Sequence, residues 1–154
     1  MNEATGIHDA WMREALALAT QAGDSGEVPV GAIVVIDGAV VGHGFNQPIA
    51  AGDPTAHAEV LAMREAARHV RNYRLTGATL VVTVEPCLMC VGAMIHARIG
   101  TVVYGTAEPR AGALGSSMAA HEAPGLNHRL VVVGGVLADD CRALMQGFFK
   151  DRRS

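Results

Sequence analysis

The chain of 154 residues lacks several features that would place it in a special class of protein. No apolar run approaches the roughly 18 residues that a membrane-spanning helix needs, and the longest runs, 28–36 and 80–84, have the length of strands. Only 18% of the residues are charged and 50% are hydrophobic, which excludes the composition of a disordered chain. We therefore expect one compact domain, residues 1–154, that does not span a membrane.

Cysteine is scarce, and basic residues do not outnumber acidic ones. Three cysteines, an odd number, argue against a framework of disulfides. The formal net charge of −3 gives no overall basic surface, so a nucleic acid would have to bind a local patch. The first residues lack the basic start and apolar stretch of a secretory signal, which favours a cytoplasmic location. In that reducing compartment, Cys87 and Cys90 are more typical of metal or redox chemistry than of a disulfide.

The apolar pattern predicts an initial helix and a hairpin, followed by alternating helices and strands. Asp37-Gly38 is a strong hairpin-turn signal between two β-rich stretches, and Asp53-Pro54-Thr55 is a candidate helix start. This order predicts an α/β fold with three layers, α/β/α, around a mixed sheet of about five strands. The expected helices lie near 11–22, from 55 to 70, from 87 and over 138–150; the expected strands are 28–36, 40–45, 79–84, 99–104 and 130–133, with 105–128 unassigned.

A histidine and two cysteines stand at predicted helix starts, His57 in T-A-H-A-E-V and Cys87 and Cys90 in P-C-L-M-C. Helix starts that follow strands gather at one edge of an α/β sheet, so we expect the two segments to meet there. Zinc prefers imidazole nitrogen and thiolate sulfur, and a catalytic zinc has three protein ligands and one open position. We therefore predict one zinc ion per chain, bound by His57, Cys87 and Cys90.

Glu59 is harder to place, because residues two apart project from different sides of a helix. Only at the first turn could its side chain reach the open zinc position without occupying it. There it could take a proton from the zinc-activated water and pass it to a substrate. A structural zinc site would need a fourth protein ligand, and the remaining cysteine, Cys141, lies on an apolar helix face and is interpreted as a core residue.

Taken singly, each of these residues also has an ordinary structural interpretation. A lone His57 would more often cap a helix, and a lone C-x-x-C pair leaves several classes of protein open. Aromatic and basic residues near the C-terminus suit single-stranded nucleic acid, yet basic residues are common at helix ends for dipole reasons alone. These residues are Phe148, Phe149, Lys150, Arg152 and Arg153.

The pattern H-x-E, followed after a strand by P-C-x-x-C, resembles the zinc-dependent nucleobase deaminases. The resemblance covers nearly the whole chain and is strongest to the branch of that family that acts on adenosine in bacterial tRNA. The segments that carry it are E-V-P-V-G-A at 27–32, G-F-N-Q-P at 44–48, D-P-T-A-H-A-E at 53–59, N-Y-R-L at 72–75, E-P-C-L-M-C-V-G-A-M-I-H-A-R-I at 85–99 and F-F-K-D-R-R at 148–153.

This resemblance implies a cytidine deaminase-like fold and a homodimer. It also implies hydrolytic conversion of adenosine to inosine at the wobble position of a tRNA anticodon stem-loop, with an arginine tRNA as the expected substrate and the base flipped into the pocket. The implied roles are zinc binding for His57, Cys87 and Cys90, proton transfer for Glu59, nucleoside binding for Asn46, and a pocket lined by the backbone around Ala58 and Pro86.

One loop departs from the pattern of the family. Relatives commonly carry an Asp followed two places later by Lys, whereas this chain has Glu108-Pro109-Arg110, which keeps the charges but changes their reach.

Two other functions also fit the motifs. A deaminase of free guanine, cytosine or their nucleosides would share the zinc core. A zinc-stabilised RNA-binding module without catalysis would share the metal ligands but would have no use for Glu59.

Overall fold

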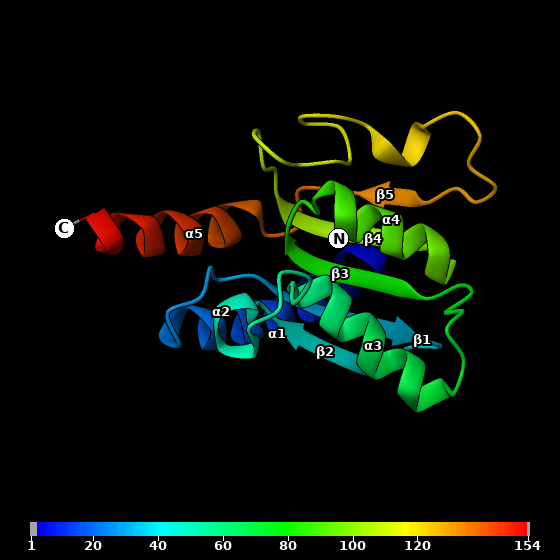
Figure 1. Cartoon of the computed structure of the whole chain (residues 1–154), viewed down its shortest axis with the longest axis horizontal. Coiled ribbons are helices and arrows are strands. Elements are labelled where there is room, and N and C mark those ends of the chain that lie inside the picture. Colours follow the sequence, from blue (N-terminus) through cyan, green and yellow to red (C-terminus); the bar gives the residue numbers. More distant parts are fainter. Residues whose placement is uncertain (1–2, 154) are drawn as a thin grey trace.

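A mixed five-stranded sheet forms the centre of the molecule (Figure 1), in the order β2-β1-β3-β4-β5. The computed structural model describes the backbone of residues 3–153 and the side chains of residues 6–152. Strand β1 (Gly31–Ile36) pairs antiparallel with β2 (Ala39–Phe45) and with β3 (Thr79–Val84). Strands β4 (Thr101–Thr106) and β5 (Val131–Val133) continue parallel to β3. Because β2 and β3 run in the same direction, the segments that leave their carboxyl ends emerge at one edge of the sheet.

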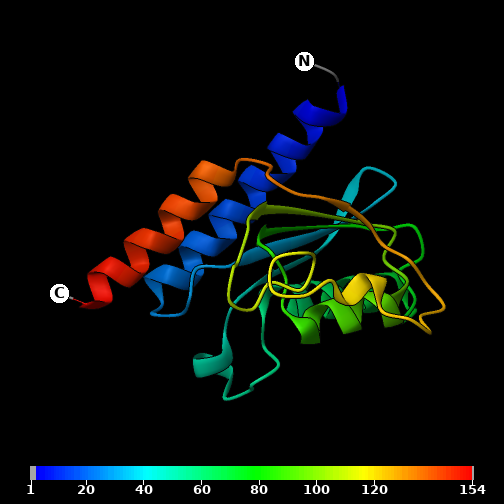
Figure 2. The ribbon, with the colours of Figure 1, turned by 90° about the horizontal axis from the view of Figure 1, so that it is seen from above.

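Helices cover both faces of this sheet (Figure 2). Helices α1 (Glu3–Asp24) and α5 (Ala138–Arg153) pack on one face, and α3 (Ala58–Val70) and α4 (Leu88–Ala97) pack on the other. The predicted three-layer α/β/α arrangement with a mixed five-stranded sheet is therefore confirmed. In the described part of the chain, no helix has both the length and the apolar character to cross a bilayer.

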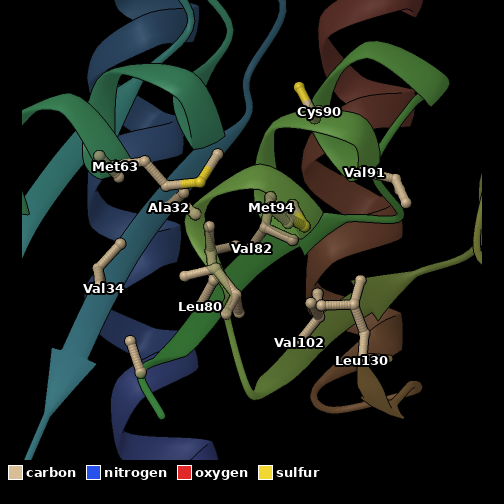
Figure 3. Close-up of a cluster of buried hydrophobic side chains, with 14 of the residues drawn as sticks. Ala32, Val34, Met63, Leu80, Val82, Cys90, Val91, Met94, Val102 and Leu130 are labelled. Atoms are coloured by element: carbon tan, nitrogen blue, oxygen red, sulfur yellow. The ribbon is translucent and has the colours of Figure 1, made fainter. Parts of the chain in front are cut away.

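Successive side chains of the central strands point to opposite faces of the sheet, and this divides the apolar interior into two cores. On β1, Ile33 and Val35 face α1 and α5, whereas Ala32 and Val34 face α3 and α4. The side chains of strand β3 alternate in the same way. Its Leu80 lies fully buried in the core that faces α3 and α4 (Figure 3). Truncating such a residue to alanine costs about 2–5 kcal/mol of the free energy of unfolding, because a cavity is left behind.

Two glycines in β2 allow α3 to lie very close to the sheet. A Cβ atom on Gly44 would lie 2.2 Å from the carbonyl oxygen of Ala58, and one on Gly42 would lie 2.2 Å from that of Ala62. Any side chain at these positions would push the helix away from the sheet. The two glycines therefore fix the start of α3, which carries part of the functional site.

Two predicted helix starts are wrong by a few residues. Asp53 does not begin α3 but forms a turn, in which its carboxylate accepts hydrogen bonds from the N–H and the hydroxyl group of Thr55, at 2.8 and 2.7 Å. The helix begins only at Ala58, after the N-cap residue His57. Likewise Cys87 is not in the first turn of α4 but is its N-cap residue, immediately before Leu88.

The remaining differences are short elements and the ends of helices and strands. Helix α1 begins at Glu3, eight residues before the predicted helical pattern. The sheet begins at Gly31 instead of Val28, and β4 starts two residues later than predicted, at Thr101. Helix α2 (Pro48–Ala51) was not predicted. The unassigned region after β4 contains a short 3₁₀ helix, Ala120–Glu122, and a bridge between Leu114 and Ala119.

Candidate active site

His57 lies at the N-terminus of α3 with its imidazole free to bind a ligand. As the N-cap residue it has extended backbone angles and makes no capping hydrogen bond with its own side chain. The side chain of Asn46, from the segment after β2, does this instead: its Oδ1 accepts the N–H of Ala58 at 2.8 Å. The helix end is thus satisfied by a neighbouring segment, and the histidine side chain is left for other chemistry.

The two cysteines of α4 meet His57 at the edge of the sheet. The Nδ1 atom of His57 lies 3.6 Å from Sγ of Cys87 and 3.5 Å from Sγ of Cys90. Zinc bonds of about 2.3 Å to sulfur and 2.0 Å to nitrogen, at tetrahedral angles, would separate these atoms by about 3.5 Å. Figure 3 shows the sulfur of Cys90 pointing away from the core residue Met94. The three donor atoms, all within 4.8 Å of one another, therefore fit a zinc ion with three protein ligands.

The surroundings of the two cysteines favour a thiolate at Cys87, which is less buried than Cys90. The hydrogen bond with Cys90 is the main cause that lowers the pKa of Cys87 to about 4, and His57 adds to the effect. The same hydrogen bond, followed by burial, raises the pKa of Cys90. Because metal binding requires thiolates, zinc must displace the proton that Cys90 retains.

Glu59, the second residue of α3, is buried beside the three donor atoms. Its side chain is only 4% exposed and interacts with His57, Cys87 and Cys90. Burial raises the pKa of this carboxyl group to about 7, although its own backbone N–H and the imidazole of His57 oppose the shift. His57 and Glu59 are two residues apart and yet reach the same site, because His57 precedes the helix and the direction of its side chain is not set by helical periodicity. A group that titrates near neutrality at this position is suited to proton transfer.

The other predicted pocket residues also lie around this site. Asn46, Ala58 and Pro86 are all buried. The carbonyl oxygen of Pro86 accepts the N–H of Ala113 at 2.8 Å, which brings the loop after β4 against the segment that carries the cysteines. A cavity of about 590 Å³ lies elsewhere, between the end of β4 and α5, and none of the three zinc-site residues lines it.

Two buried carboxylates near the site were not recognised in the sequence. Glu27, 2% exposed, accepts the N–H groups of Ile49 and Ala50 at 3.2 and 2.8 Å, and so fixes the start of α2. Glu85, 3% exposed, accepts hydrogen bonds from the loop after β4. A signal existed for Glu85, because a carboxylate directly after an apolar strand and before Pro86 is expensive to bury without partners.

Glu85 receives four hydrogen bonds from three residues. Its Oε1 accepts the N–H of Glu108 at 3.1 Å and the hydroxyl group of Ser116. Its Oε2 accepts the N–H groups of Leu114 at 3.0 Å and of Ser116 at 3.1 Å. Burial alone would raise the pKa of Glu85, but these hydrogen bonds outweigh it and hold the pKa below its usual value.

Comparison with known proteins assigns the family. The model of the cytidine and deoxycytidylate deaminase zinc-binding region matches residues 5–106. The chain belongs to this family. The matched region contains His57, Cys87 and Cys90, whose geometry fits zinc, and zinc is therefore the cofactor of this chain.

Similar proteins of this family share nearly the whole length of the chain. A tRNA-specific adenosine deaminase of Haemophilus influenzae is 46% identical over 143 residues, which cover 92% of this chain and 83% of that protein. One of Bacillus subtilis is 39% identical over 145 residues, covering 94% and 90%. A solved structure from work on A-to-I editing by tRNA:A34 deaminases at the wobble position has a TM-score of 0.86, with 37% identity, and covers 88% of this chain and 98% of that one.

The aromatic and basic residues near the C-terminus lie on the other face of the sheet. Helix α5 packs on α1, β3 and β4, not on α3 and α4, which carry the zinc site. The guanidinium group of Arg152 lies 4.7 Å from the ring centre of Phe148 and donates a hydrogen bond to the carbonyl oxygen of Gly26. Phe149 and Lys150 are exposed, and the side chain of Arg153 lies outside the described residues.

Proposed function

We propose that this chain is a zinc-dependent enzyme that converts adenosine to inosine by hydrolysis at the wobble position of a tRNA anticodon. The observation that carries the proposal is the buried carboxylate of Glu59 beside a metal site with three protein ligands. The substrate is inferred from the relatives, which are named tRNA-specific adenosine deaminases and match more than nine-tenths of the chain.

His57, Cys87 and Cys90 would hold the zinc ion, which supplies activation of a water molecule for attack on the amino-bearing carbon of the base. Glu59 would accept a proton from that water and pass it to the ring nitrogen beside the attacked carbon. It would then carry the proton of the added hydroxyl group to the amino group, which leaves as ammonia. Transfer of this kind typically contributes a factor of about 10²–10⁴ to a rate. A structural zinc site would gain nothing from burying this carboxylate.

Asn46 would orient the nucleoside from the other side of the pocket. Because its Oδ1 is held by the N–H of Ala58, only the Nδ2 amide is left to donate to a ligand. The backbone at Ala58 and Pro86, which follows β2 and β3 at the same edge of the sheet, would line the pocket. The target base must leave its stack to reach this buried position.

The decisive experiment uses the purified zinc-loaded protein and an anticodon stem-loop with adenosine at the wobble position, the arginine tRNA first. Inosine, detected by nucleoside analysis after digestion, is the expected product. Parallel reactions contain free adenosine, guanine, cytosine and cytidine. Conversion of a free base or nucleoside with none of the stem-loop would replace the proposal by a deaminase of free bases or nucleosides, and binding of the stem-loop without conversion of any substrate would leave an RNA-binding module.

We also propose that the enzyme is a homodimer and acts in the cytoplasm. Leu88 and Met89, in the first turn of α4 beside the site, are 57% and 37% exposed, which suits an apolar contact with a second subunit. Size-exclusion chromatography coupled to light scattering tests the dimer, and a measured mass of one chain would reject it.

The cytoplasm is the expected compartment, because it keeps thiol ligands such as Cys87 and Cys90 reduced and contains the tRNA.

The exposed end of α5 is proposed as an RNA-binding surface. Phe149 and Lys150 offer an aromatic ring and a cation to solvent, a combination that single-stranded nucleic acid uses for stacking and phosphate contact. Arg152 adds a further cation on the same helix, and Arg153 follows it in the sequence. This proposal covers affinity and leaves the chemistry to the zinc site.

A further inference from the structure

We infer that Glu85 is a positioning residue. It holds the loop of residues 107–116 in one conformation in the free protein, and RNA binds against this loop beside the zinc site. The inference rests on the function proposed above but concerns a carboxylate with no part in zinc binding or proton transfer. It follows from how the two oxygens of this side chain are used, and from which part of the chain they hold.

The carboxylate closes the loop at both ends. Oε1 takes the N–H of Glu108, near the start of the loop, and the hydroxyl group of Ser116, at its end. Oε2 takes the N–H groups of Leu114 and Ser116. All four donors belong to the loop, and a single buried side chain thus joins residues that are eight positions apart.

The same loop is tied to the segment that leads to the zinc ligands. The N–H of Ala113 donates to the carbonyl oxygen of Pro86 at 2.8 Å, and the N–H of Glu85 donates to the carbonyl oxygen of Thr106 at 2.9 Å. The segment that contains Cys87 and the loop after β4 are therefore held together as one unit. The loop lies at the edge of the sheet that carries the zinc-site residues.

The tip of the loop is exposed and depends on its base for its shape. Pro109, Arg110 and Ala111 are exposed, and the hydrogen bonds of Ala111 and Gly112 at the tip go back to Glu108. Because Glu108 is itself held by Glu85, the position of the exposed Arg110 cation on this loop follows from the buried carboxylate. A basic side chain at this place suits a phosphate of the RNA on either side of the flipped base.

Gly112 gives independent support for a tightly built contact. A Cβ atom at this position would lie 2.4 Å from Cδ of Glu85 and 2.5 Å from the carbonyl oxygen of Glu108. The loop is therefore shaped around the carboxylate, and any side chain at Gly112 would displace it. If the loop were not held in the free protein, RNA would have to order it on binding, and affinity would fall.

The test compares Glu85→Gln, Gly112→Ala and Ser116→Ala with a control variant, Gly6→Ala. Among the described residues, the added methyl group would have no atom within 4 Å outside its chain neighbours and the backbone of its own helix. For each zinc-loaded variant we measure zinc content, and kcat and KM with the anticodon stem-loop. Glu85→Gln is expected to raise KM about tenfold, the size expected for one lost charge-assisted hydrogen bond, and to change kcat less than about threefold. Gly112→Ala should act in the same direction and Ser116→Ala more weakly, all with zinc retained.

Hydrogen exchange of the amides of Leu114 and Ser116 gives a second readout, which needs no catalysis. These amides should exchange faster in Glu85→Gln and unchanged in Gly6→Ala. Loss of zinc, or a lower kcat at unchanged KM, would show that Glu85 supports the metal site instead and would overturn the inference. If Glu85→Gln does not fold, Ser116→Ala decides by the same criteria.

Failure of the proposed function is distinguishable from failure of this inference. If the wild-type protein makes no inosine, the proposed function is wrong, and the inference is then decided by RNA affinity and amide exchange. Weaker stem-loop binding by Glu85→Gln, together with faster exchange of the loop amides, supports the inference. Equal affinity of the wild type and Glu85→Gln overturns it.

Discussion

The zinc site and the end of α5 contain chemically active side chains that are held in opposite ways. At the site, His57 and Glu59 are fixed by contacts from segments far apart in the sequence, and the second is almost fully buried. At the end of α5, Phe149 and Lys150 are exposed on a single helix. Changes at the site should therefore abolish a function, whereas changes on the helix should reduce binding gradually and in a salt-dependent way.

The largest effect is expected for Cys87→Ala. The remaining two donors cannot hold zinc in a three-ligand site, so the variant should contain far less than one zinc per chain and form no detectable inosine. Elemental analysis and the stem-loop assay measure both. The matched control is Cys141→Ala, which removes a buried thiol on the opposite face of the sheet and should keep zinc and turnover. A zinc content of one in Cys87→Ala would contradict the ligand assignment.

The second effect separates metal binding from proton transfer. Glu59→Gln should retain zinc but lower kcat by about 10²–10⁴, because an amide of the same shape cannot carry the proton. Glu65→Gln is a suitable control, since Glu65 lies on the same helix but is exposed and pairs with His43 at 3.0 Å. Single-turnover kinetics with saturating enzyme give the chemical step directly. Unchanged turnover in Glu59→Gln would remove the proposed mechanism.

The third effect divides the two functions of Asn46. Asn46→Ala removes the acceptor for the N–H of Ala58 and should lower the free energy of unfolding by about 0.5–2 kcal/mol, as for the loss of a helix cap. Asn46→Asp keeps the acceptor but lacks the Nδ2 donor, so we expect near wild-type stability with a raised KM. Urea unfolding and stem-loop kinetics distinguish the two variants. If both have the same KM as the wild type, the nucleoside-binding role is wrong.

The layers and the three candidate zinc ligands could be predicted from the sequence because each has a recognisable local pattern, although the candidate ligands meet only through tertiary contacts. Alternation on β1 and helical spacing define which faces are buried, and His57 and the C-x-x-C pair carry recognisable ligand chemistry. The helix starts were misplaced because Asp53 can either cap a helix or form a turn, and only tertiary contacts decide between them. Glu85 was missed because its donors lie more than 20 residues further along, in a region without a periodic pattern.

The smallest effect tests the exposed region and uses two neighbouring cations. Lys150 is exposed, so Lys150→Ala should leave stability unchanged and should lower the slope of log affinity against log salt for stem-loop binding by about 1 if it contacts one phosphate. Arg152 also packs on Phe148 and donates to Gly26, so Arg152→Ala should lower the free energy of unfolding as well. Binding titrations at several salt concentrations, with urea unfolding, measure both quantities. A slope that neither variant alters would confine RNA binding to the edge of the sheet that carries the zinc site, where the loop held by Glu85 supplies the exposed Arg110.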